Sequence, residues 1–337
     1  MVAATLCLVV AACVAGAACA GDPAPAPSTE DPAAVEAVVR LAADAHGGPV
    51  AVLAVDNSTG ETVAAATAGD AAHAPLGGGA RPAASLVKAV VLAAALESGV
   101  APHDVLIVPQ CIPLAERLAC TTRPGEVTVL EAAAHSNNPA FVLLADRAGP
   151  DAVAGYGARV GMELVPSRLL PLGLDAVTME SVAALFVALA NDGETPAVAG
   201  RDGAKSLGAA GRFVSAETAR AMRKVLRVVV TDGTGRAADG PDEPYGKTGT
   251  AEGRTDAWFA GVSGDLTIVV WAGARDGAAA PGTAGIDAPA GAEADYETLL
   301  DNDEQPAGGG PRLTGGGLPA RVFREVANLL SVSAPAA

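Results

Sequence analysis

The sequence is poor in aromatic side chains, in basic side chains and in histidine. Phe, Trp and Tyr together make up 3% of its 337 residues, and 22 Lys and Arg stand against 38 Asp and Glu, a formal net charge of −16. So acidic a chain lacks the basic surface that neutralises phosphates, which argues against nucleic-acid binding. Because the four histidines, His46, His73, His103 and His135, show no ligand spacing, we expect no metal site, and nothing in the sequence calls for a cofactor.

Small and apolar residues dominate instead. Half of the residues are hydrophobic and 18% are charged, which is enough to bury a sizeable core in one large domain or two small ones. Much of the acidic excess is local, because the segment between Arg275 and Arg312 holds eight carboxylates and no Lys or Arg. We expect residues 276–311 to form a mobile acidic loop.

The first 32 residues differ from the rest of the chain. Residues 2–20 carry no charge and are almost wholly apolar, and a Pro/Ala-rich stretch follows at 21–32. We interpret residues 1–20 as an export signal, a lipoprotein signal or a membrane anchor, and residues 21–32 as a tether. Cys13 and Cys19 each end a short run that resembles a lipobox, so both are candidate sites of lipid attachment. Every one of these interpretations places the domain outside the cytoplasm, and we expect it at the extracytoplasmic face of the cell membrane.

Two cysteines lie far from this leader. In an exported protein, Cys111 and Cys120 are a candidate disulfide. The loop between them has about ten residues, and closing a loop of that size is worth roughly 2.7 kcal/mol by chain entropy. Two unpaired thiols are the alternative.

Hydrophobic periodicity and turn residues locate the main elements. The predicted elements are a helix at 33–46, a hairpin at 50–67, strands at 247–252, 257–262 and 266–272, and a helix at 318–330. A further apolar helix is predicted from the Ser85 turn to about Gly99, and after it we expect loops and helices up to about Asn191. Strands on both sides of a helical middle predict an α+β fold, in which one antiparallel sheet pairs its first and last segments and carries an inserted helical lobe.

Three short motifs carry the candidate chemistry. They are Ser-x-x-Lys at residues 85–88, Ser-Asn-Asn at 136–138 and Lys-Thr-Gly-Thr at 247–250. An offset of three residues on a helix puts Ser85 and Lys88 on one face, so the amine can take a proton from the hydroxyl. The helix N-terminus there favours developing negative charge, which suits acyl transfer. Each motif also has a purely structural alternative. The first could be a solvated pair of side chains on an exposed helix, the second a helix-capping turn, and the third an edge strand with a protective lysine.

Together the three motifs resemble the signature of serine β-lactamases and penicillin-binding proteins. The likeness continues in the segments V-A-V-L-A-V-D-N-S-T-G-E, V-T-D-G-T-G-R-A-A, D-A-W-F-A-G and T-G-G-G-L-P-A-R-V-F-R-E. Over residues 33–333 the chain resembles the transpeptidase domain of class A penicillin-binding proteins, without their glycosyltransferase domain. The resemblance implies a five-stranded antiparallel sheet flanked by helices, in a multi-layer α/β/α arrangement with an inserted helical subdomain.

The resemblance also implies a role for each catalytic residue. Ser85 would attack the penultimate carbonyl of a D-Ala-D-Ala peptide, with Lys88 as its base and Ser136 relaying the proton to the leaving nitrogen. The backbone N–H groups of Ser85 and Thr250 would form the oxyanion hole. Lys88 has to be neutral for this, and a cation about 4 Å away, such as Lys247, would favour that form by about 4 kcal/mol at an effective dielectric of 20.

The substrate-binding residues follow from the same resemblance. Asn138 would hydrogen-bond the peptide amide of the substrate. Lys247, Thr248 and Thr250 would hold the carboxylate that D-alanyl peptides and penicillins share. Gly249, with no side chain, would let the substrate lie along the strand edge.

We therefore expect an exported serine D,D-transpeptidase that cross-links peptidoglycan stem peptides, binds β-lactams covalently and works with a separate glycosyltransferase. A D,D-carboxypeptidase or a β-lactamase would use the same acyl-enzyme. A β-lactamase needs a base that activates water, and the nearest downstream carboxylate, Glu163, has no flanking asparagine to help hold one. A non-catalytic sensor of β-lactams or muropeptides is the alternative from another functional class.

Overall fold

A computed structural model of the chain describes residues 32–70, 74–115, 117–196, 211–274 and 313–331. The expected leader at 1–20, with Cys13 and Cys19, lies outside the described residues, as do the tether up to residue 31 and the acidic segment at 276–311. Within the described part, no helix combines the length and the apolar character needed to cross a membrane.

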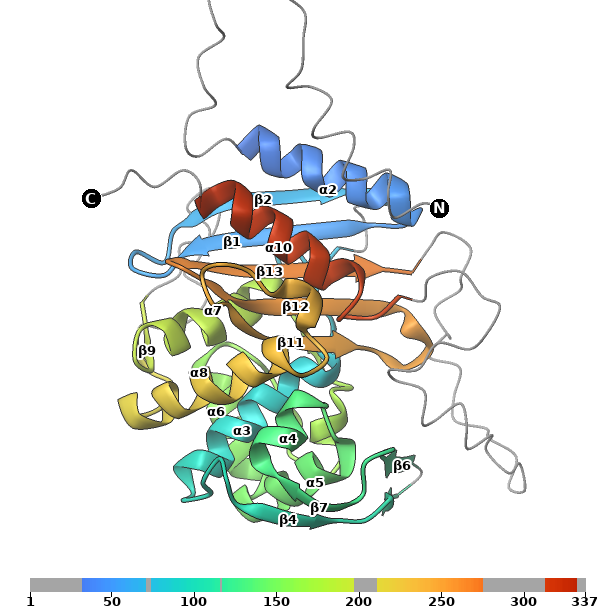
Figure 1. Ribbon diagram of the computed structural model, residues 1–337, viewed down its shortest axis with the longest axis vertical. Coiled ribbons are helices and arrows are strands. Elements are labelled where there is room, and N and C mark those ends of the chain that lie inside the picture. The colour runs from blue at the N-terminus through green and yellow to red at the C-terminus, as the bar shows by residue number, and fades with distance from the viewer. Residues whose placement is uncertain (1–31, 71–73, 116, 197–210, 275–312, 332–337) are drawn as a thin grey trace, which may run out of the picture.

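The fold is organised around one five-stranded antiparallel sheet with the strand order β11-β12-β13-β1-β2 (Figure 1). Its strands are β1 (Val50–Asp56), β2 (Thr62–Ala68), β11 (Tyr245–Thr250), β12 (Asp256–Ser263) and β13 (Leu266–Gly273). Val50 pairs with Ala272 and Asp56 with Leu266, which confirms that the first and last strand segments meet. Strand β11 lies at the edge of this sheet, so one side of it has no strand partner within the sheet.

One face of the sheet is covered by the two terminal helices of the described chain, α2 (Pro32–His46) and α10 (Leu318–Ser331) (Figure 1). Apolar residues recur every three or four positions in α10, which gives that helix a single buried stripe. Phe323 in this stripe packs against Phe259 of β12 with ring centroids 4.7 Å apart. Alternate residues of β1, such as Val50 and Val52, point into the same cluster.

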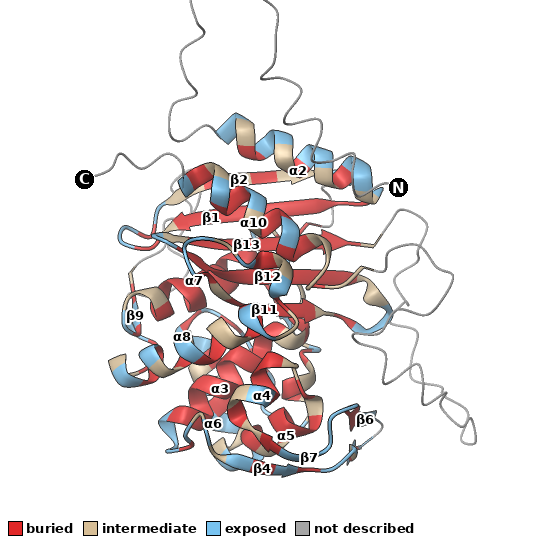
Figure 2. Cartoon of the chain, in the orientation of Figure 1, coloured by how far each residue is buried: buried red, intermediate tan, exposed pale blue. Residues whose placement is uncertain are grey.

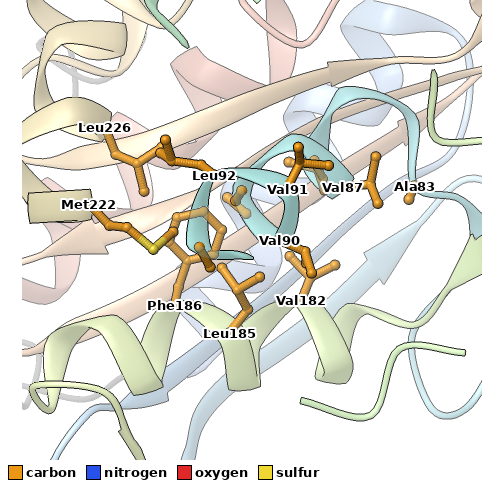
Figure 3. Close-up of a cluster of buried hydrophobic side chains, with 14 of the residues drawn as sticks. Ala83, Val87, Val90, Val91, Leu92, Val182, Leu185, Phe186, Met222 and Leu226 are labelled. Atoms are coloured by element: carbon orange, nitrogen blue, oxygen red, sulfur yellow. The ribbon is translucent and has the colours of Figure 1, made fainter. Parts of the chain in front are cut away.

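The other face carries the helical lobe that the sequence predicted. Its helices are α3 (Lys88–Glu97), α4 (Val129–Ala134), α5 (Asn138–Ala148), α6 (Pro150–Arg159), α7 (Met179–Ala190) and α8 (Ala216–Thr231). Helix α3 runs through the middle of the lobe and is buried on all sides (Figure 2). Figure 3 shows Leu92 of α3 on the side of Met222 and Leu226 of α8, and Val90 of α3 on the side of Leu185 of α7. Because α3 has no solvent face, it forms a rigid base for the residues at its N-terminus.

The described residues also form short two-stranded ribbons, and those within residues 105–128 lie in the segment after α3 where only loops and helices were expected. They are β4 (Val105–Val108) with β7 (Gly125–Thr128), β5 (Cys111–Leu114) with β6 (Arg117–Cys120), β3 (Arg81–Pro82) with β8 (Ala176–Val177), and β9 (Glu194–Thr195) with β10 (Gly211–Arg212). Cys111 and Cys120 face each other across β5 and β6, and a disulfide joins them. This hairpin rests on α5 through an apolar cluster that includes Ile112 and Val142.

Candidate active site

Ser85 lies in a single 3₁₀ turn, η2 (Ala84–Val87), which leads directly into α3. The preceding residue, Ala84, has a left-handed backbone with φ 48°, which costs about 1–2 kcal/mol for a residue other than glycine. Its N–H donates to the carbonyl of Gly173 at 2.9 Å. A Cβ on Gly173 would lie 1.8 Å from the Ala84 carbonyl oxygen, so only glycine permits this approach. Strained backbone held by its surroundings is typical of functional sites.

Two strands of the sheet hold the residues that lead into this turn. The carboxylate of Asp256, 1% exposed, accepts hydrogen bonds from Arg81 Nε at 2.7 Å and from Trp271 Nε1 at 2.9 Å. The indole of Trp258 donates to the carbonyl of Pro82 at 3.0 Å. No sequence motif indicates the pairing of Asp256 with Arg81, because it joins segments that are 175 residues apart in the chain.

The Ser136 hydroxyl lies between the amines of Lys88 and Lys247. Its Oγ is 3.1 Å from Lys88 Nζ and 2.9 Å from Lys247 Nζ, and the lysines are 1% and 0% exposed. These two distances limit the separation of the amines to about 6 Å, so two positive charges there would repel by roughly 3 kcal/mol at an effective dielectric of 20. Burial and this repulsion both favour a neutral amine on one of the two lysines.

Lys88 turns its amine toward the Ser-Asn-Asn turn. Nζ donates to the Ser136 carbonyl at 2.6 Å and to Asn138 Oδ1 at 2.5 Å. Ser85 lies in η2 and Lys88 begins α3, so their offset of three residues along one helical run puts both on one face, as expected.

The turn that carries Ser136 connects α4 to α5. Ser136 has a left-handed backbone with φ 53°. Asn137 is the N-cap of α5, since its Oδ1 accepts the N–H of Ala140 at 3.1 Å. Asn137 therefore fills the capping role that was the structural alternative for the whole motif, whereas Ser136 and Asn138 face Lys88.

The third motif lies on the edge strand β11. Thr248 Oγ1 is 2.6 Å from Thr234 Oγ1, and Thr250 Oγ1 accepts the N–H of Gly315 at 3.1 Å. A Cβ on Gly249 would lie 3.2 Å from Leu86 Cγ and 3.3 Å from the Ala83 carbonyl oxygen. The bare Cα thus faces the turn that holds Ser85, and its expected role beside a substrate stays a prediction.

The structure therefore brings all three motifs together, and Lys88, Ser136 and Lys247 form one continuous hydrogen-bonded set. Glu163, the carboxylate weighed for a β-lactamase, lies exposed in the segment that follows α6. In the described part of the chain it forms no hydrogen bond or ion pair with any residue of the three motifs.

Comparison with known proteins identifies relatives of this arrangement. The chain matches the family described as the penicillin binding protein transpeptidase domain over residues 50–278. It is 33% identical over 160 residues to penicillin-binding protein 1A of Aquifex aeolicus, a match that covers 44% of this chain and 22% of that protein. It is 31% identical over 165 residues to penicillin-binding protein 1B of Escherichia coli, covering 44% and 19%. The chain thus matches about a fifth of the length of these relatives.

Solved structures share the fold. Penicillin binding protein 3 of Mycobacterium tuberculosis, complexed with aztreonam, superposes with a TM-score of 0.65 at 23% identity, covering 89% of this chain and 76% of that one. A peptidoglycan glycosyltransferase from Burkholderia ambifaria gives a TM-score of 0.66 at 18% identity, covering 90% and 98%. The chain belongs to the penicillin-binding protein transpeptidase domain family, whose β-lactamase-like fold it has.

Proposed function

We propose that the chain is an exported serine D,D-transpeptidase, which acts on D-Ala-D-Ala stem peptides of peptidoglycan and is acylated by β-lactams at Ser85. The observation that carries the proposal is the position of the Ser136 hydroxyl between Lys88 and Lys247, next to the turn that bears Ser85. One hydroxyl between two buried amines is suited to moving a proton, because it can accept from one amine and donate to the other.

The hydrogen bonds around Lys88 suit a general base. A neutral amine has two N–H donors and one lone pair, and the Ser136 carbonyl and Asn138 Oδ1 can only accept. Those two oxygens account for both donors, so the lone pair accepts a hydroxyl proton, from Ser136 in the resting site and from Ser85 during acylation. Lys247, whose Nζ also donates to the Thr248 carbonyl at 3.1 Å, is then the protonated member of the pair.

Acylation then proceeds in two balanced steps. The Ser85 hydroxyl gives its proton to Lys88 while Oγ bonds to the carbonyl carbon, and the N–H groups of Ser85 and Thr250 stabilise the oxyanion. When the carbon–nitrogen bond breaks, Ser136 gives its proton to the leaving nitrogen and receives one from Lys88. The amine of Lys88 is thereby neutral again, and the acyl group remains on Ser85.

The edge strand would hold the rest of the substrate. Lys247 supplies a positive charge, and Thr248 and Thr250 supply hydroxyl donors for the terminal carboxylate. Asn138 would bind the peptide amide. Because β11 has a free edge in the sheet, a peptide could lie beside it as an added strand.

What attacks the acyl-enzyme decides between related activities. An amine of a second stem peptide gives a transpeptidase, and water gives a D,D-carboxypeptidase. The exposed position of Glu163 gives no support to a β-lactamase that relies on this residue. We further propose that residues 33–333 form the transpeptidase domain, that residues 1–20 direct export or anchor it to the membrane, with Cys13 or Cys19 as the lipid site, and that a separate glycosyltransferase is a partner.

The test is a time course of intact mass after the purified protein is mixed with benzylpenicillin, followed by peptide mapping. We expect a one-to-one adduct on Ser85 that lasts for many minutes and is absent from the Ser85→Ala variant. Rapid loss of the adduct with turnover of the drug would indicate a β-lactamase. A folded protein that forms no adduct would contradict the proposal and favour the non-catalytic sensor.

A further inference from the structure

The loop between α8 and β11 brings Thr234 against two of the three motifs. The Thr234 N–H donates to the carbonyl of Ala134 at 3.0 Å, two residues before Ser136. Its side-chain Oγ1 is 2.6 Å from Oγ1 of Thr248. One residue thus joins the turn that carries Ser136 to the edge strand.

Backbone contacts on both sides fix Thr234 in this position. A Cβ on Gly233 would lie 2.2 Å from the Ala134 carbonyl oxygen, and a Cβ on Gly316 would lie 2.2 Å from the carbonyl oxygen of Thr234 itself. Such close approaches require glycine at both positions. The Thr234 backbone is therefore held at a place from which its side chain reaches Thr248.

The short distance between the two hydroxyls restricts how their protons are arranged. Only one proton can lie between Thr234 Oγ1 and Thr248 Oγ1. If Thr234 donates it, the proton of Thr248 is free to point at a bound anion. If Thr248 donated it, Thr248 would present lone pairs to the same anion and repel it.

The neighbouring threonine follows the same pattern. Thr250 Oγ1 accepts a hydrogen bond from the N–H of Gly315, and an amide N–H can only donate. The hydroxyl proton of Thr250 is therefore also left for a ligand. A donor that itself accepts a hydrogen bond is strengthened by polarisation.

We propose that Thr234 is a positioning residue for the carboxylate subsite: its hydroxyl donates to Thr248 and so directs the proton of Thr248 to the ligand carboxylate. The inference rests on the proposed function, in which Thr248 binds the carboxylate shared by D-alanyl peptides and penicillins. It assigns no contact between Thr234 and the substrate, so Thr234 acts only through Thr248.

The experiment compares two ligands on four proteins. The ligands are benzylpenicillin and its methyl ester, which has no free carboxylate. The proteins are the wild type, Thr234→Val, Thr234→Ser and the control Thr231→Val, in which the threonine bonds Asp232 and Arg227 near the end of α8. The second-order rate constant of acylation is measured for each combination, and the melting temperature verifies folding. Should Thr234→Val fail to fold, Thr234→Ala replaces it.

We expect Thr234→Val to slow acylation by benzylpenicillin about tenfold, the loss typical of one hydrogen bond that supports a charged ligand, and to leave the slower reaction of the ester unchanged. Thr234→Ser should restore the wild-type rate, and Thr231→Val should match it. Equal slowing of both ligands, or no slowing of either, in a folded Thr234 variant would overturn the inference alone. A wild type that neither ligand acylates would overturn the proposed function and leave no subsite for Thr234 to position.

Discussion

The contact between β11 and the turn that holds Ser85 predicts a specific defect in Gly249→Ala. The added Cβ would lie 3.2 Å from Leu86 Cγ, 3.2 Å from Trp258 Cβ and 3.3 Å from the Ala83 carbonyl oxygen. Ordinary contacts of this kind are about 3.5–4.0 Å, so the turn and the strand have to separate by roughly half an ångström. Overpacking of this size costs about 1–3 kcal/mol, which lowers Tm by roughly 3–9 °C.

The same displacement should impair catalysis. Ala83 and Leu86 flank Ser85, so a shift of the turn moves its Oγ relative to the Thr250 N–H on the strand. Because a misplacement of about 1 Å can cost hundredfold in rate, half of that is expected to slow acylation about tenfold.

The assay combines a thermal melt with the rate of acylation by a fluorescent penicillin. Gly240→Ala is the matched control, because a Cβ there finds its nearest atom, Asn328 Oδ1, at 4.0 Å. The control should keep both the wild-type Tm and the wild-type rate. A Gly249→Ala protein with the same Tm and acylation rate as the control would refute the argument that Gly249 is needed for the approach of the turn.

Three further predictions concern buried groups. Lys88→Ala and Lys247→Ala should each slow acylation by about a hundredfold or more, because either change leaves the Ser136 hydroxyl with one amine. Near wild-type rates in either variant would contradict the roles proposed for the two lysines. Peptide mapping without reduction should recover Cys111 and Cys120 as one linked pair, and replacing both with serine should lower the free energy of unfolding by about 2.7 kcal/mol; an unchanged value would contradict this. Asp256→Asn leaves Arg81 without its partner charge and should cost about 1.5–3 kcal/mol in urea unfolding, because the Arg81 side chain is 25% exposed; a loss below about 0.5 kcal/mol would argue against the pairing.

Long apolar patterns allowed the main elements to be predicted from the sequence. Strands β1 and β13 were predicted from apolar runs and helix α10 from its helical periodicity, and the structure contains all three elements. Such patterns depend on local residues alone. The ribbons β4 with β7 and β5 with β6 escaped prediction because four-residue strands are too short to show a period. For the ribbon of β5 with β6, the candidate disulfide between Cys111 and Cys120 was the one indication in the sequence that the two segments meet.

At the site, the sequence indicated which residues would gather but not how they are held. Three motifs sufficed to nominate Ser85, Lys88 and Lys247, because their chemistry is local to each motif. The left-handed backbone of Ala84 depends on a loop nearly ninety residues away, at Gly173. The contact of Thr234 with Thr248 is likewise a tertiary contact, so no pattern of residues in the sequence predicts it.

The pairing of β1 with β13 also bears on the order in which the molecule can fold. Val50 and Ala272 are roughly 220 residues apart in the chain, so the centre of the sheet closes only after almost all of the chain is available. Until then β1 and β2 form a two-stranded hairpin, which is marginally stable on its own and exposes apolar strand edges to aggregation. The helices between β2 and β11 have more local contacts, so a nascent chain is expected to gain its helical lobe first and its sheet last.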